Sequence, residues 1–170
     1  MKNLVRQFLN GIANSSTARS LRLVIDPIAD RQSSQNIVSG ALAITGAGST
    51  TAKIGSVIYG VANGAIYTKA ANTNMPALVG TVTNTKFNVF VFSIDKAGNL
   101  TTQIGLEGSA LNTVVMPEPI FNNAIIGFVI INPTGTGNFV GGTTPLDDAT
   151  VVPNAVYVNV TGGLDATILP

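Results

Sequence analysis

The chain has 170 residues, of which 45% are apolar and only 10% charged, so it is long enough to bury a core but carries far less charge than the roughly 25% of a typical soluble domain. It contains no cysteine and no histidine. These absences exclude a disulfide framework, a thiolate metal site and histidine as a general base, while the apolar content argues against disorder.

Charge is divided unevenly along the chain. All nine Lys and Arg lie within residues 1–96, whereas residues 97–170 carry acids alone. Two explanations stay open. The charges solvate exposed loops, or they make complementary contacts between neighbouring chains or between the N-terminal arm and the body of the protein.

The N-terminal residues have an amphipathic pattern. Leu4, Val5, Phe8, Leu9 and Ile12 fall at helical spacing within residues 2–13, and Gly11 is a helix-stop signal. A helix this short is not stable alone in water, so we expect it to lie on a surface. Residues 14–36 read as an extended connector, which gives a domain plan of an N-terminal arm and connector (1–36) and a β-domain (37–170).

No apolar run reaches the roughly 18 residues of a membrane helix, and residues 1–13 lack the apolar region of a signal peptide. We therefore expect no membrane association and a product that is cytosolic when made.

From residue 37 onward the pattern is that of β-strands. Asn63 and Gly64 tolerate positive φ and predict a hairpin turn between residues 53–62 and 65–70. A second hairpin is predicted over residues 86–105, and further strands at 124–131 and 155–160. Seven to nine short strands between 37 and 162 predict an all-β fold, with a single β-sandwich or β-barrel (jelly-roll-like) domain behind an extended, partly helical N-terminal arm.

Two strands are apolar on both faces, at residues 86–94 and 124–131. A sheet with one face in water alternates apolar and polar residues, so something must cover the second face. The cover is either a loop or the arm of the same chain, or it is another subunit, as in obligate interfaces. The residues predicted to make such a self-association interface are Phe90, Phe92, Ile126 and Phe128.

The sequence matches no catalytic or ligand-binding motif well. The glycine-rich stretches 44–53 and 134–145 match neither a dinucleotide-binding fingerprint nor a P-loop, because no helix pattern or Gly-Lys-Ser/Thr follows. Asp147-Asp148 and the pair Asp26 and Asp30 read as loop carboxylates, and Asp95 with Asn99 as a turn that lacks the further acids of a calcium loop. We predict no catalytic, cofactor-binding or metal-binding residue and no enzymatic activity.

The basic residues of the arm and connector are Lys2, Arg6, Arg19, Arg22 and Arg31. They are sparse and not interleaved with aromatic residues, so binding to nucleic acid is not favoured. An acidic protein surface is at least as good a partner for them as nucleic acid.

Four stretches between about residues 50 and 162 carry a family resemblance: VIYGVANGAIYTKA, GTVTNTKFNVFVFSIDKAGNLTT, IIGFVIINPTGTGNFVGGTTPLDDATV and AVYVNV. In phrase and composition they resemble small structural proteins of tailed bacteriophages, including capsid decoration and cement proteins. The resemblance implies a virion component without enzymatic activity, rich in β-structure and often trimeric.

The function that the resemblance implies is that of a capsid decoration or cement protein on the virion surface, assembled in the host cytoplasm. Such a protein binds the major capsid protein as a homo-oligomer, with a trimer favoured, and we expect it to need no cofactor. The arm residues expected to dock on the capsid are Leu4, Arg6, Phe8, Leu9, Ile12, Arg19 and Arg22. The alternative is a tail, baseplate or head-fibre component that contacts the host surface. A carbohydrate-binding module is a third class, against which the absence of Trp counts.

Overall fold

The structure, a computed structural model, describes residues 33–162 and confirms an all-β, sandwich-like fold. The predicted arm, residues 1–32, lies outside the described residues. Within them the strands are β1 (Gln35–Asn36), β2 (Ala43–Ile44), β3 (Ala52–Ile54), β4 (Ile58–Ala62), β5 (Ala65–Lys69), β6 (Thr73–Asn74), β7 (Thr81–Val82), β8 (Asn88–Ile94), β9 (Leu100–Ile104), β10 (Ala124–Ile131), β11 (Phe139–Val140) and β12 (Val156–Asn159), with one 3-10 helix, η1 (Leu111–Thr113).

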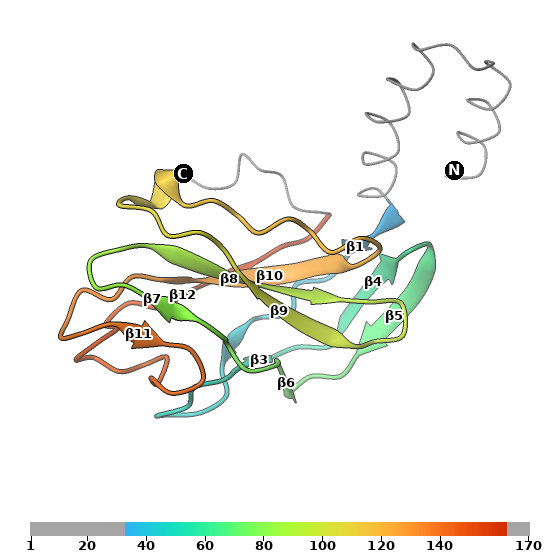
Figure 1. Cartoon of the computed structure of the whole chain (residues 1–170). Coiled ribbons are helices and arrows are strands. Elements are labelled where there is room, and N and C mark those ends of the chain that lie inside the picture. Colours follow the sequence, from blue (N-terminus) through green and yellow to red (C-terminus); the bar gives the residue numbers. More distant parts are fainter. Residues whose placement is uncertain (1–32, 163–170) are drawn as a thin grey trace, which may run out of the picture.

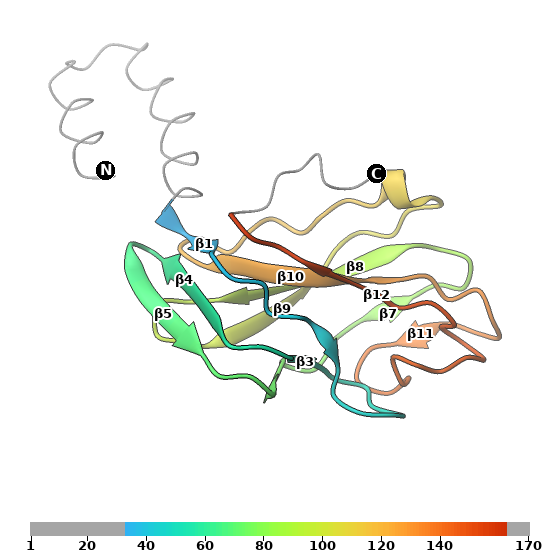
Figure 2. The same ribbon diagram turned by 180° about the vertical axis from the view of Figure 1, so that it is seen from behind.

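The strands form two facing layers (Figures 1 and 2). The larger layer is an antiparallel sheet in the order β12-β10-β8-β9, and it holds the two longest strands. The opposing layer is built from three small sheets, β1-β4-β5, β2-β3-β6 and β11-β7. Such short strands leave many turns, in agreement with the Gly, Asn and Thr content of the sequence.

The main core lies between the two layers. Phe90, Phe92 and Ile94 point into it from β8, because alternate residues of a strand face the same side. Phe139 of β11 meets Phe90 edge-to-face, with ring centroids 5.9 Å apart. A β-bulge between Ile125 and Gly127 shifts the alternation of β10, so that Ile126 and Val129 both reach this core despite their odd spacing.

The second face of the large sheet is covered from within the chain. Val89 and Val91 of β8 and Phe128 of β10 form a separate buried cluster with Val114, and Leu111 and Met116 pack against it. The covering residues come from the irregular segment after β9, drawn in yellow over the sheet in Figure 1. Of the two explanations for the two-faced strands, the structure therefore supports cover by a loop of the same chain.

The structure contradicts the prediction that four apolar residues of the two-faced strands form a self-association interface. Phe90, Phe92 and Ile126 lie in the main core and Phe128 in the second cluster, and none is more than 1% exposed. Because these side chains are buried within the chain itself, they have no exposed surface with which to contact a second copy.

Both predicted hairpins are present. Asn63 and Gly64 have φ values of 51° and 75° and join β4 to β5 with Val61 opposite Ile66. β8 and β9 pair with Ile94 opposite Leu100. The Asn-Gly turn allows two positive φ angles without strain, which matches the right-handed twist of the paired strands.

A buried polar cluster fixes β1 in place, although its residues fall in the stretch predicted as a connector. Asn36 is 0% exposed, and its Nδ2 donates to Val38 O (2.7 Å) and Val160 O (3.2 Å). Its Oδ1 accepts from the hydroxyl of Tyr67 (3.2 Å), whose pKa is raised by burial. The Gly162 amide donates to Asn36 O (2.8 Å), so the two ends of the described chain lie side by side.

Candidate functional site

The glycine-rich stretch at residues 44–53 is a turn that links β2 to β3, as the sequence predicted. The Gly48 amide donates to both carboxylate oxygens of Asp147, at 3.1 and 3.0 Å, and Leu146 N donates to Ser49 O. The amide that could bind a phosphate is thus occupied by a carboxylate of the same chain. The second stretch, 134–145, contains the short strand β11 and packs through Phe139 into the core.

Asp95, Asp147 and Asp148 serve turns, whereas Asp26 and Asp30 lie outside the described residues. Asp95 accepts from the amides of Ala97 and Asn99 and from Asn99 Nδ2, and the Asn99 side chain is the main cause of its lowered pKa. Asp148 does the same with Thr150, whose hydroxyl lowers its pKa. Within residues 33–162 no group of three acids is placed to hold a metal ion, and no helix is long and apolar enough to cross a membrane.

The feature of the described residues that most resembles a binding site is the outer face of the sheet β1-β4-β5. Two cross-strand rows make up this face: Ile37, Tyr59 and Thr68 in one, Gln35, Val61 and Ile66 in the other. We call it the β1-β4-β5 face. Ile66 is 82% exposed, Ile37 58% and Tyr59 49%, which is unusual for large apolar side chains next to one another on a sheet.

The face is exposed because of strand alternation. Ile58, Gly60 and Ala62 of β4 and Tyr67 of β5 point into the core, so the residues between them must point outward. None of the six side chains in the two rows is charged. Lys69 at the end of β5 turns away, with its Nζ donating to Gly98 O at the β8–β9 turn (2.7 Å).

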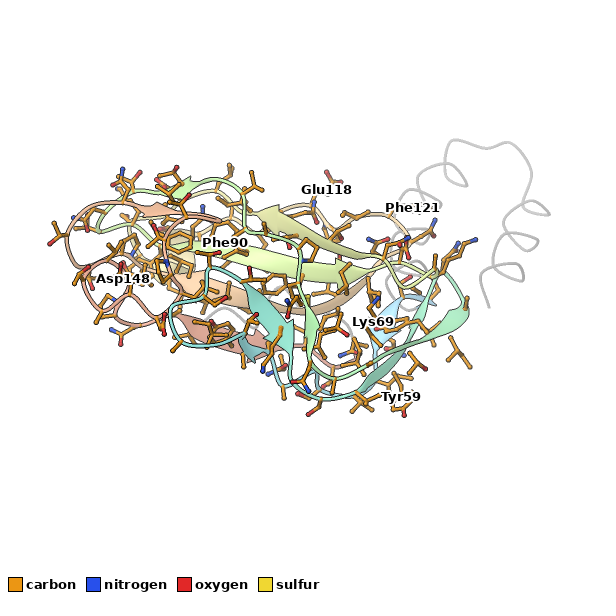
Figure 3. All side chains as sticks on the ribbon, turned by 90° about the horizontal axis from the view of Figure 1, so that it is seen from below. Tyr59, Lys69, Phe90, Glu118, Phe121 and Asp148 are labelled. Carbon is orange, nitrogen blue, oxygen red and sulfur yellow. The ribbon has the colours of Figure 1, made fainter. Side chains whose placement is uncertain are left out.

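Other exposed apolar residues form smaller groups. Leu106 and Val115 face each other across an isolated bridge and are 67% and 55% exposed, with Glu107 beside them in sequence. In Figure 3, Tyr59 lies at one margin of the molecule, and Glu118 and Phe121 lie at the opposite margin. The β1-β4-β5 face is therefore distinct from the margin that carries Glu118 and Phe121.

The N-terminal end of the described chain is attached at the edge of this face. Ser33 O accepts from the Gly64 amide (3.1 Å), and Ser34 Oγ accepts from the Asn63 amide (2.9 Å). Both partners belong to the β4–β5 turn, next to the Val61–Ile66 row. The described chain therefore begins directly beside the exposed apolar face.

The arm residues predicted from the sequence to bind the capsid lie outside the described residues: Leu4, Arg6, Phe8, Leu9, Ile12, Arg19 and Arg22. The β1-β4-β5 face itself was not predicted as a site. The signal available in the sequence was that residues 57–62 are apolar at both alternating positions, like the two strands that are apolar on both faces. Among the described residues, however, the outer face of residues 57–62 lacks the loop that covers those two strands. No family model, curated protein or solved structure matches the chain.

Proposed function

We propose that the chain is a non-enzymatic structural protein of a bacteriophage virion, a capsid decoration or cement protein that binds the major capsid protein. The observation that carries the proposal is an uncharged, exposed apolar sheet face placed beside the point where an amphipathic N-terminal segment enters the fold. Its second support is the sequence resemblance to small structural proteins of tailed phages.

In this mechanism the two surfaces have separate roles. The arm docks on the capsid through Leu4, Phe8, Leu9 and Ile12, with its basic residues on acidic capsid surface. The β1-β4-β5 face then contacts a neighbouring copy, a role for which the buried residues Phe90 and Phe92 are not available. Simultaneous contacts raise the effective concentration of each further contact, and binding to the assembled lattice stabilises it by mass action.

The first test is the copy number of the chain in purified particles of the phage that encodes it, measured against the major capsid protein by quantitative mass spectrometry. A simple whole-number ratio to capsid subunits is the expected result. A few copies per particle would instead support the tail, baseplate or head-fibre alternative. Absence from the particle would refute a virion role.

The second test addresses the arm. Phe8→Asp puts a charge into the predicted apolar stripe, and we expect it to abolish co-sedimentation with capsids that lack the chain. Asn10→Asp adds the same charge on the opposite side of the predicted helix and is the matched control, expected to bind as the natural chain does. Equal binding by both variants would rule out docking through the stripe.

A further inference from the structure

We propose that, in the free protein, residues 2–13 lie on the β1-β4-β5 face of their own chain and cover it until a capsid takes the arm away. The inference rests on the proposed function only for the identity of the surface that displaces the arm, namely the capsid. The closed form itself is a property of the isolated chain. The closed form regulates access to the exposed face, because the apolar stripe of the arm and the apolar face shield each other from premature association.

The first argument is the position at which the arm joins the fold. Ser33 and Ser34 are hydrogen-bonded to the turn that bounds the face, so the preceding residues start next to Val61 and Ile66. A tethered segment has an effective concentration in the millimolar range for a short flexible linker. Any other occupant at ordinary protein concentrations competes against that advantage.

The second argument is length. Residues 14–32 can span up to about 60 Å when extended, far more than β4, whose five residues measure about 17 Å. The connector therefore permits residues 2–13 to fold back along the hairpin. As a helix these twelve residues would be about 18 Å long, which matches the length of the strand.

The third argument is chemistry. The face presents Ile37, Tyr59, Val61 and Ile66 without a charge among its two rows. The arm needs an apolar surface for its stripe and leaves its basic residues in water, so the uncharged face accepts it without an unpaired charge. The other exposed pair, Leu106 and Val115, has the acidic residue Glu107 next to it in the sequence.

The sequence provides a clean spectroscopic test, because it contains no tryptophan. Phe8→Trp in the full chain places a single reporter in the stripe. We expect its emission to be shifted to the blue, and its quenching by acrylamide to be several-fold weaker than that of the same substitution in a peptide of residues 1–32. Both values should be independent of protein concentration.

Two variants in the Phe8→Trp background identify the surface. Ile66→Asp should shift the emission to the red and restore quenching to the level of the peptide. Val79→Asp should change neither, although Val79 is 75% exposed and receives the same charge. Thr68→Lys, also exposed on the face, is the second variant if Ile66→Asp does not fold by circular dichroism.

Three results would overturn the inference: a reporter exposed to water in the unsubstituted background, an equal response to Ile66→Asp and Val79→Asp, or a blue shift that grows with protein concentration, which would place the arm on a second copy. None of these measurements involves a capsid. A closed form in a chain that is absent from particles would therefore contradict the proposed function and leave this inference intact.

Discussion

Replacing Asn36 with alanine tests whether the buried polar cluster holds β1, and with it the attachment of the arm, against the sandwich. The substitution leaves three groups without their partner: Val38 O, Val160 O and the Tyr67 hydroxyl. A buried polar group without a hydrogen bond costs about 1–3 kcal/mol. Val160 O and the Tyr67 hydroxyl lose buried hydrogen bonds, whereas the bond to Val38 O is only partly buried, so water can replace it. At the lower value for each buried group, we expect a loss of about 2 kcal/mol.

The Tyr67 hydrogen bond can be isolated in a double-mutant cycle. Tyr67→Phe alone removes the hydroxyl and leaves Asn36 Oδ1 unpaired, at an expected cost of about 1–2 kcal/mol. Since the two substitutions remove the same hydrogen bond, their effects should not add, and the coupling energy should be about 1 kcal/mol. Asn112→Ala, on an exposed residue of η1, is the matched control and should lie within about 0.5 kcal/mol of the natural chain.

The assay is urea unfolding followed by far-UV circular dichroism, and hydrogen exchange at the Ile37 and Gly162 amides reports the local effect. Ile37 N donates to Tyr59 O and Gly162 N to Asn36 O, so both amides should exchange faster in Asn36→Ala. A loss of less than about 1 kcal/mol, or a coupling energy of zero, would refute the view that this cluster fixes β1.

Three further predictions concern packing and pH. Gly60→Ala should destabilise by about 1–3 kcal/mol, because a Cβ would overlap the hydroxyl and ring of Tyr67 and crowd the Gln35 carbonyl oxygen. The same substitution should cost less in a Tyr67→Leu background than in the natural chain, and an equal cost in both backgrounds would contradict this reason. Phe90→Ala should cost about 3–5 kcal/mol in urea unfolding, since the ring is fully buried in the main core, and a loss near zero would contradict that placement. Tyr157→Phe should not destabilise at pH 7, because its buried hydroxyl has no hydrogen-bond partner among residues 33–162. Burial, with a smaller contribution from Asp147, raises the pKa of Tyr157 to about 12. The natural chain should therefore lose stability as the pH rises from 10 to 12, and Tyr157→Phe should lose less, by up to about 1.4 kcal/mol per pH unit. Parallel curves of stability against pH for the two chains would refute the raised pKa.

The hairpins could be predicted because their signals are local. Asn63-Gly64 specifies a turn that needs two positive φ angles, and Asp95 and Asn99 form a turn whose hydrogen bonds stay within five residues. The apolar content of residues 86–94 and 124–131 likewise showed that both faces are buried. These features depend on neighbours in the sequence, where pattern reasoning is strongest.

The parts that were missed depend on distant contacts. β1 and β11 are only two residues long, too short for any periodic pattern, and exist because β4 and β7 offer partners. The cover of the second face comes from a stretch with Gly105, Gly108 and two prolines that reads as a loop, and it contributes only a few apolar side chains. Asn36 looked like a polar connector residue, because its burial depends on Tyr67 and on Val160, which follows β12 far along the chain.

The candidate site shows the same division. The amphipathic stripe of residues 2–13 was visible as a pattern, whereas the face beside it was not, since Tyr59 and Val61 could as well have been core residues. Only the register of β4 with β5, which turns Ile58 and Tyr67 inward, exposes them. This face is exposed because no other described segment packs over it, and a sequence pattern alone does not show which segments pack together.

The energetics of the arm explain why a covered face could still function. Burying the five apolar residues of the stripe gains up to about 15 kcal/mol at 1.5–3 kcal/mol per large side chain, and the exposed parts of the face add to this. Ordering twelve backbone residues costs about 18 kcal/mol at 1–2 kcal/mol each, before the helical hydrogen bonds are counted. Because the two quantities are similar in size, the proposed docking of the arm would be reversible, and a capsid surface that buries only somewhat more apolar area than the β1-β4-β5 face would be sufficient to displace it.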